Sequence, residues 1–170
     1  KEYLTHDTIP VRLFYGDSTK FNLQFFADNR RINSGELYFV PDASMKNLNA
    51  SDSEKTLTMR MDISETAHID YIYTMYPDDY MMDFSIRLVG MDRYRTDNVV
   101  FNWEVFFPST EKGYTNESNY SNMYYRFKNG DIEKFNMRSK KSLEEQTAST
   151  QIDWIAYKQQ FFSTVLIAQD

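Results

Sequence analysis

Residues 57–63 read Leu-Thr-Met-Arg-Met-Asp-Ile, and the same alternation returns in residues 69–75, Ile-Asp-Tyr-Ile-Tyr-Thr-Met, and in residues 82–88, Met-Asp-Phe-Ser-Ile-Arg-Leu. A period of two places every second side chain on the same face of a β-strand. The connections between the three segments are short, and the second contains Pro77, which favours a turn. We therefore predict an antiparallel meander over residues 55–90, with one face buried.

Short apolar or alternating segments elsewhere in the chain also predict β-strands. We expect further strands at residues 11–15, 21–25, 36–40, 99–107, 123–127 and 132–137. Residues 99–107 contain Trp103 and form a predominantly apolar, aromatic run, which is typical of a central strand buried on both faces. Asn129-Gly130 predicts a tight hairpin in which both residues have positive φ. Residues 42–53 and 109–122 are polar and are predicted as loops.

The longest apolar segment, residues 152–168, lies near the end of the chain and holds the second tryptophan, Trp154. A helix would place Ile155, Gln159 and Phe162 on one face. The β-branched content of Thr164 to Ile167 and the β character of the rest of the chain favour two strands instead. Because a terminal segment this apolar must be tied into the core, we predict that it anchors the fold through Trp154, Gln159, Gln160, Phe161 and Phe162.

Length and composition limit the class of protein. The chain has 170 residues, enough for one domain with a sizeable core. Many short strands favour a sandwich or a barrel, and we predict an all-β antiparallel β-sandwich over residues 1–170. The net charge of −6 argues against nucleic-acid binding, which needs a basic face. The chain lacks cysteine and any apolar run long enough to span a membrane. Its first residues, Lys1-Glu2-Tyr3, are typical of an excised fragment.

The sequence contains few candidates for catalytic or metal-binding residues. His6 and His68 lack a second ligand at metal-binding spacing, and the paired carboxylates Asp78-Asp79 and Glu144-Glu145 are expected in solvated turns and loops. We therefore predict no catalytic, cofactor-binding or metal-binding residue, and no cofactor. A partner is expected to meet the hairpin between residues 69 and 88. Its polar face, formed by Asp70, Thr74, Asp83 and Arg87, is expected to be exposed, and an edge strand can pair with another chain.

The abundant aromatic residues allow a second interpretation. Tyr114, Tyr120, Tyr124 and Tyr125 either pack over a sandwich edge or, with Trp103, form a platform for a sugar or a peptide. The packing interpretation is favoured. The platform would make the chain a carbohydrate-binding or mutarotase-like sandwich module.

Residues 154–167, Trp-Ile-Ala-Tyr-Lys-Gln-Gln-Phe-Phe-Ser-Thr-Val-Leu-Ile, resemble the end of the large periplasmic domain of YidC-type membrane protein insertases. In that family a Trp precedes Gln-Gln, paired aromatics and an apolar strand. Residues 69–76 and 79–84 are similar to the family's hairpin, in which an acidic residue and Tyr precede the second strand. The aromatic, Asn- and Asp-rich style resembles members from Bacteroidetes-type bacteria.

The resemblance implies a fold and a role. The family's domain is a β-supersandwich, similar to galactose-mutarotase and sugar-binding sandwiches, at the periplasmic face of the bacterial inner membrane. It carries no catalytic residues, and insertion of nascent membrane proteins belongs to the transmembrane part of the protein. Its expected partners are SecDF and the Sec translocon, together with the membrane through that transmembrane part. Because the family's first strands have no counterpart in this sequence, the chain would be a C-terminal portion of the domain.

Overall fold

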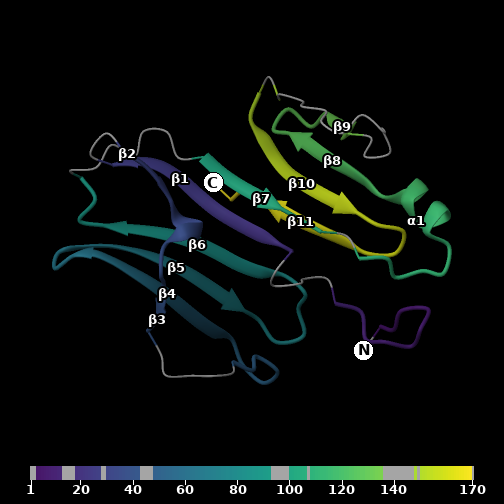
Figure 1. The fold of residues 1–170 in the computed structure, drawn as a ribbon, viewed down its shortest axis with the longest axis horizontal. Helices are drawn as coiled ribbons and strands as arrows, with labels where there is room; N and C mark the ends of the chain where they lie inside the picture. The colour runs from purple at the N-terminus through teal and green to yellow at the C-terminus, as the bar shows by residue number, and fades with distance from the viewer. Residues whose placement is uncertain are drawn as a thin grey trace. The chain divides into compact units, whose positions relative to one another are not determined.

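The computed structural model describes residues 3–12, 18–27, 30–42, 48–92, 100–106, 108–135, 148 and 150–169. Its strands form three antiparallel sheets (Figure 1). The chain divides into two compact units, Lys1–Lys20 with Glu104–Asp170 as unit 1 and Phe21–Trp103 as unit 2. The predicted all-β antiparallel class is confirmed.

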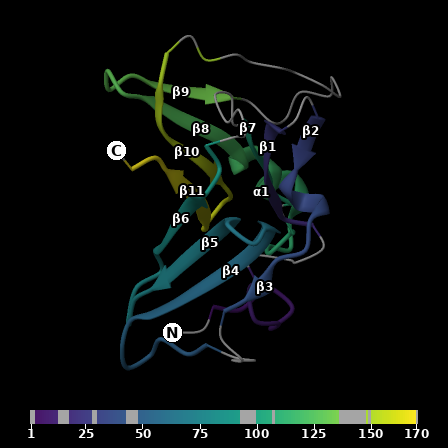
Figure 2. The ribbon, with the colours of Figure 1, turned by 90° about the vertical axis from the view of Figure 1, so that its left-hand side faces the viewer.

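The predicted meander is confirmed and forms most of a four-stranded sheet in unit 2. Its strands follow the order β3 (Val40–Pro41), β4 (Lys55–Ser64), β5 (Ala67–Met75) and β6 (Met82–Val89). β4 and β5 run side by side in Figure 2 and pair from Lys55↔Met75 to Ser64↔Ala67, with an irregularity between Asp62 and Ser64. The Glu65-Thr66 turn joins them as tightly as the sequence predicts.

A second sheet packs against this one and completes a sandwich. It has the order β2 (Arg30–Asn33), β1 (Lys20–Ala27) and β7 (Val100–Glu104). Side chains from β1 and β5 interleave between the two sheets, because alternation turns one face of each strand inward. The buried core consists of Leu23, Phe25, Ala67, Ile69, Tyr71 and Met91.

Two predictions for unit 2 are wrong. Of residues 36–40 only Val40 lies in a strand, at the start of β3. The Asn33 side chain accepts a hydrogen bond from Gly35 N at 3.0 Å and starts the short 3-10 helix η1 (Ser34–Glu36), which takes the place of the predicted strand. β7 is not a central strand buried on both faces. It ends its sheet, and Val100 is 51% exposed. Residues 99 and 107, the limits of that predicted strand, lie outside the described residues.

Unit 1 contains the third sheet, with the order β11 (Ser163–Ile167), β10 (Ile152–Lys158), β8 (Asn122–Phe127) and β9 (Ile132–Phe135). Residues 152–168 thus form two strands, as favoured, and not a helix. They pair from Trp154↔Ile167 to Lys158↔Ser163. The predicted strands at residues 123–127 and 132–137 are confirmed up to Phe135, and residues 136–137 lie outside the described part of the chain. Of the predicted strand 11–15, only residues 11 and 12 are described, and neither belongs to a strand.

The predicted loop at residues 109–122 contains a helix, α1 (Tyr114–Tyr120). Its seven residues are too few to be stable alone. The Glu117 carboxylate, which is buried, holds the helix in place by accepting hydrogen bonds from Thr110 N at 2.8 Å and from the Ser109 hydroxyl. This contact joins residues on either side of Gly113, so it depends on the folded chain and leaves no local pattern in the sequence.

The Asn-Gly hairpin is present, but its turn differs from the prediction. Of its two central residues only Gly130 has positive φ, at 100°. Gly130 N donates to Phe127 O and Phe127 N donates to Asp131 O, both at 2.9 Å. The Asn129 side chain accepts from Asp131 N at 3.1 Å. Asn129 therefore stabilises the turn through its side chain, and Gly130 supplies the left-handed backbone.

We expect Gly130→Ala to lower the free energy of unfolding by about 1 kcal/mol, because alanine disfavours positive φ. A Cβ at this position would meet nothing closer than Arg126 Nη2 at 3.9 Å, so no clash contributes. Urea denaturation measures the change. Asn129→Gly, which keeps a permissive backbone and removes only the side-chain bonds, is the matched comparison. An unchanged stability in Gly130→Ala would contradict the turn.

Candidate functional site

The outward-facing residues of β4, β5 and β6 form a largely polar surface of unit 2. Alternation turns Arg60 on β4, Asp70 on β5 and Arg87 on β6 to the same face of the sheet. The register then places the three side by side, with Arg60↔Asp70 and Asp70↔Arg87 as directly opposed pairs. We call this surface, made of the even-numbered residues of β4 and β5 and the odd-numbered residues of β6, the outer face.

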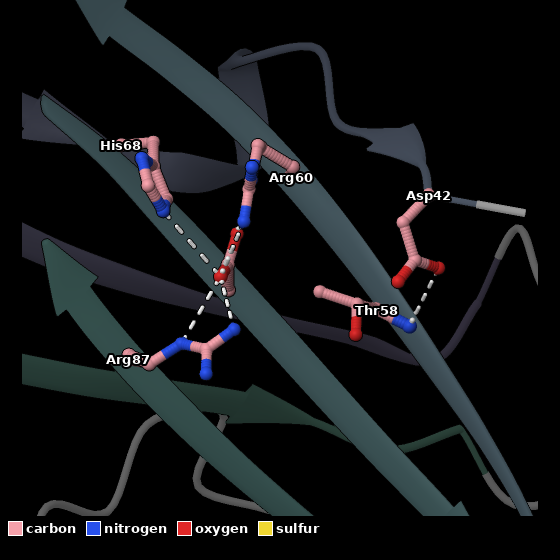
Figure 3. Close-up of polar contacts among 6 residues, drawn as sticks. Asp42, Thr58, Arg60, His68 and Arg87 are labelled. Carbon is pink, nitrogen blue, oxygen red and sulfur yellow. Dashed lines mark hydrogen bonds and ion pairs between the residues drawn. The ribbon is translucent and has the colours of Figure 1, made fainter. Parts of the chain in front are cut away.

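Two arginines and a histidine surround the Asp70 carboxylate (Figure 3). Arg60 donates from Nε to Oδ1 at 2.7 Å and from Nη2 to Oδ2 at 3.0 Å. Arg87 donates from Nη2 and Nε to Oδ2 at 2.7 and 3.1 Å. His68 Nε2 lies 3.6 Å from the same oxygen. One carboxylate thus links all three strands. Arg60 forms a bidentate pair with both of its oxygens, and Arg87 donates two hydrogen bonds to Oδ2 alone.

The carboxylate of Asp70 is inaccessible to solvent, whereas its partners are not. The side chain of Asp70 is 0% exposed, while those of Arg60 and Arg87 are 41% and 56% exposed. The hydrogen bonds from Arg60, helped by those from Arg87, lower the pKa of Asp70 to about 2, although burial acts in the opposite direction. The bond to Asp70 also raises the pKa of Arg60, on which Asp62 and Asp42 act as further negative charges. The Asp70 carboxylate therefore stays ionised at neutral pH. We call Arg60, His68, Asp70 and Arg87 together the Asp70 cluster.

Asp42 secures the strand beside the cluster. Its Oδ1 accepts from Thr58 N at 3.3 Å, next to the short strand β3 (Figure 3). The arrangement as a whole fixes the direction of two cationic side chains on a flat sheet. It contains no nucleophile paired with a base, and what it offers chemically is a set of oriented hydrogen-bond donors.

The partner-facing residues predicted from the sequence do lie together. Asp70 opposes Arg87 and Thr74 opposes Asp83 in the β5–β6 register. The expected exposure of Asp70 is wrong, because the two arginine side chains cover its carboxylate. The sequence reasoning missed Arg60 and His68. Alternation places Arg60 on the same face as Asp70, but the register irregularity between Asp62 and Ser64, which the sequence does not reveal, is what brings the two into direct opposition.

Asp70→Asn is expected to lower the free energy of unfolding by about 2 kcal/mol at pH 7, the equivalent of the pKa depression. The folded-state pKa is below the unfolded one, so this contribution is present above about pH 4 and disappears as the pH falls through about 2. Urea denaturation of both proteins from pH 7 to pH 2 measures it, and the two stabilities should converge at the acid end. Asp62→Asn, an exposed residue of the same face, serves as the control and should change little. A constant difference across this range would contradict the role of Asp70.

The predicted anchor residues at the β10–β11 hairpin lie in different environments. Gln159 is buried and donates from Nε2 to Pro108 O at 3.0 Å, and the ring of Phe162 packs edge-on against Tyr3 at 5.7 Å. Trp154 and Gln160 are half-buried. Phe161 is 67% exposed, so its predicted packing in the core is wrong. It lies at the tip between two strands, where alternation no longer directs the side chain inward.

The predicted aromatic platform of Trp103 and the four tyrosines does not form one surface within either unit. Trp103 belongs to unit 2 and the four tyrosines belong to unit 1. Among these tyrosines, Tyr125 is buried and its hydroxyl donates to Glu133 at 2.6 Å. Tyr114 and Tyr120 lie exposed on α1, and Tyr124 carries Lys134 over its ring at 5.9 Å. Within the described ranges no group of three or more His, Cys, Asp or Glu residues could hold a metal ion.

The fold and the outer face define an all-β module of the sandwich class with an ordered polar surface. The chain belongs to the YidC periplasmic domain family, whose model matches residues 1–170. The resemblance predicted from residues 154–167 and from the β5–β6 hairpin is thereby confirmed.

Relatives with curated names support the same family. The chain is 34% identical to the membrane protein insertase YidC of Bacteroides fragilis over 99% of its own length and 26% of the relative's length. The corresponding protein of Parabacteroides distasonis is 33% identical over 100% of this chain and 26% of its own length, and that of Porphyromonas gingivalis is 24% identical over 98% and 26%. The chain therefore spans about a quarter of the relatives it matches. No solved structure matches it significantly. In the part of the chain that the structure describes, no helix is long and apolar enough to cross a membrane.

Proposed function

We propose that this chain serves as a non-catalytic scaffold and docking domain of a membrane protein insertase, at the periplasmic face of the bacterial inner membrane. The observation that carries this proposal is the match of the YidC periplasmic domain family to residues 1–170. The relatives bear the name membrane protein insertase. The insertion of nascent membrane proteins would then belong to parts of the insertase beyond this domain.

The outer face is the surface that we assign to docking, and SecDF of the Sec translocon is the partner. Docking surfaces gain affinity when their polar groups are held in place before binding, because less side-chain entropy is lost. The Asp70 cluster provides this rigidity: Asp70 orients the two arginines, and Arg87 presents an exposed guanidinium. Thr74 and Asp83 continue the same face toward the β5–β6 turn.

Photo-crosslinking in membranes tests the proposal. A photoreactive amino acid at Thr56 or Asp62, both exposed on the outer face of β4, is introduced into the full-length insertase that contains this domain. We expect crosslinks to a SecDF subunit from both positions. The same group at Tyr114, which is 74% exposed on α1 in unit 1, is the control and should give none. Absence of SecDF crosslinks from the outer face, or equal crosslinking from Tyr114, would overturn the docking assignment.

A further inference from the structure

The strand β6 ends its sheet with an open edge. In the order β3-β4-β5-β6 it has a partner on one side, and no other strand of the described residues pairs with it. Its eight residues pair with β5 in continuous register from His68↔Val89 to Met75↔Met82, without a bulge. Natural proteins usually interrupt such edges with proline, a bulge or a short strand, because a regular edge can add another strand. β6 has none of these interruptions.

The inward-facing side chains of β6 are also incompletely covered. Met82 and Leu88 are 51% and 40% exposed, whereas Ile69, which opposes Leu88 on β5, is 0% exposed. Phe84, between them, packs against the rings of Tyr71 and Tyr73 and so marks this as the core side of the strand. A strand added at the edge of β6 would continue the apolar layer over Met82 and Leu88.

We propose that β6 pairs antiparallel with β6 of a second copy of this chain, about a two-fold axis at Ser85. In this register Asp83 faces Arg87 of the other copy, twice. Phe84 faces Ile86, and Met82 faces Leu88. Opposite charges and apolar pairs directly across an antiparallel ladder are the stabilising combinations. The pairing would join two four-stranded sheets into one continuous sheet of eight strands.

The sequence of β6 disfavours the other two-fold registers. An axis at residue 83 would oppose the two copies of Asp83, and an axis at residue 87 would oppose the two copies of Arg87. An axis at residue 84 or 86 loses both Asp–Arg pairs. An axis between residues would set the polar face of one copy against the apolar face of the other, which a continuous sheet excludes. Only the axis at Ser85 satisfies both the charges and the faces.

The strand that pairs with this edge is therefore β6 of a second copy, because the sequence of β6 is complementary to itself. Arg87 reaches Asp70 through Nε and Nη2, which leaves Nη1 on the opposite side of the guanidinium. A strand of an unrelated partner would need the same pattern of acidic, apolar, small, apolar and basic residues. Eight residues bury less area than a standard protein interface, so the association is weak and is best detected with a covalent trap.

Ser85→Cys provides that trap. The chain contains no cysteine, so an introduced thiol can pair only with itself. Opposed residues in an antiparallel pair have Cα atoms about 4.5–5.5 Å apart, within the range of a disulfide. We expect rapid oxidation to a disulfide-linked dimer. Asp83→Cys is the matched control: its two copies would lie about 13 Å apart along the strands, too far for a disulfide.

Sedimentation velocity of the chain without introduced cysteine gives an independent test. We expect concentration-dependent dimer formation, weakened about tenfold or more by Asp83→Lys, which opposes lysine to Arg87 in both pairs. Thermal melting confirms that each variant is folded. A Ser85→Cys protein that stays monomeric, a dimer that Asp83→Cys traps equally well, or an association insensitive to Asp83→Lys would each overturn the proposal. The docking of SecDF on the outer face is measured separately, by crosslinking from Thr56 and Asp62 on β4, so the two proposals can fail independently.

Discussion

Gly90→Ala is expected to lower the free energy of unfolding by about 3–5 kcal/mol, through a clash and a strained backbone together. Gly90 directly follows β6 and has φ of +64°, where alanine is disfavoured. A Cβ at this position would lie 2.1 Å from Thr66 O and 3.0 Å from Thr66 C. Both atoms belong to the backbone of the β4–β5 turn, so the end of β6 or the turn itself would have to move.

Comparison with Gly130→Ala separates the two causes. Gly130 also has positive φ, but a Cβ there would make only an ordinary van der Waals contact, with Arg126 Nη2 at 3.9 Å. Both variants are unfolded with urea, and the excess loss in Gly90→Ala measures the clash with Thr66. We expect that excess to be about 2 kcal/mol or more. Equal losses would show that the chain relaxes easily at Gly90, and would contradict the tight contact between the end of β6 and the β4–β5 turn.

The long strands of unit 2 were predictable because one physical rule governs them along their whole length. Alternation in residues 57–88 identifies β4, β5 and β6, and it names Ile69 and Tyr71 as core residues. The tight turn at Glu65-Thr66 begins the pairing at Ser64↔Ala67, but an irregularity between Asp62 and Ser64 shifts the register by one residue, and this shift places Arg60 opposite Asp70. Alternation alone classifies Asp70 as a solvent-facing residue. Its burial arises from neighbours on two other strands, which no single stretch of sequence displays.

The short elements were not predictable, since each depends on one long-range or side-chain contact. α1 is held by Glu117, whose carboxylate reaches Thr110 before the helix begins. η1 starts where Asn33 turns its side chain onto Gly35. β7 is rich in apolar residues, as a central strand would be, yet it ends its sheet. Composition describes how apolar a strand is, and only the topology decides which faces are covered.

The outer face could be anticipated only in part, for the same reason. The four residues Asp70, Thr74, Asp83 and Arg87 share a face because they keep the period of two in a hairpin with a recognisable turn. The ion pairs of Asp70 with the arginines could not be predicted from the sequence, because these contacts depend on side-chain conformation. An argument for docking needs both kinds of information. The sequence pattern shows which residues share a face, and the geometry shows that Asp70 fixes the direction of the Arg87 side chain, which remains partly exposed.

Ser34→Ala is expected to lower the free energy of unfolding by about 2–3 kcal/mol, because it leaves two buried donors without an acceptor. The Ser34 hydroxyl oxygen accepts from Leu23 N at 2.8 Å and from the Tyr71 hydroxyl at 2.6 Å, and all three residues are buried. Burial raises the pKa of the Tyr71 phenol, so the hydroxyl keeps its proton and remains a donor. Ser34 thereby ties β1 of one sheet to β5 of the other.

A double-mutant cycle with Tyr71→Phe tests this link. Tyr71→Phe removes one donor and leaves the bond from Leu23 N to Ser34, so we expect a loss of about 1 kcal/mol. In the double variant the orphaned hydroxyl no longer exists, and the combined loss should fall short of the sum by about 1 kcal/mol. Urea denaturation of the four proteins measures the coupling. Additive losses would show that the two hydroxyls do not interact, and the contact between the sheets would then rest on the apolar core around Ile69 alone.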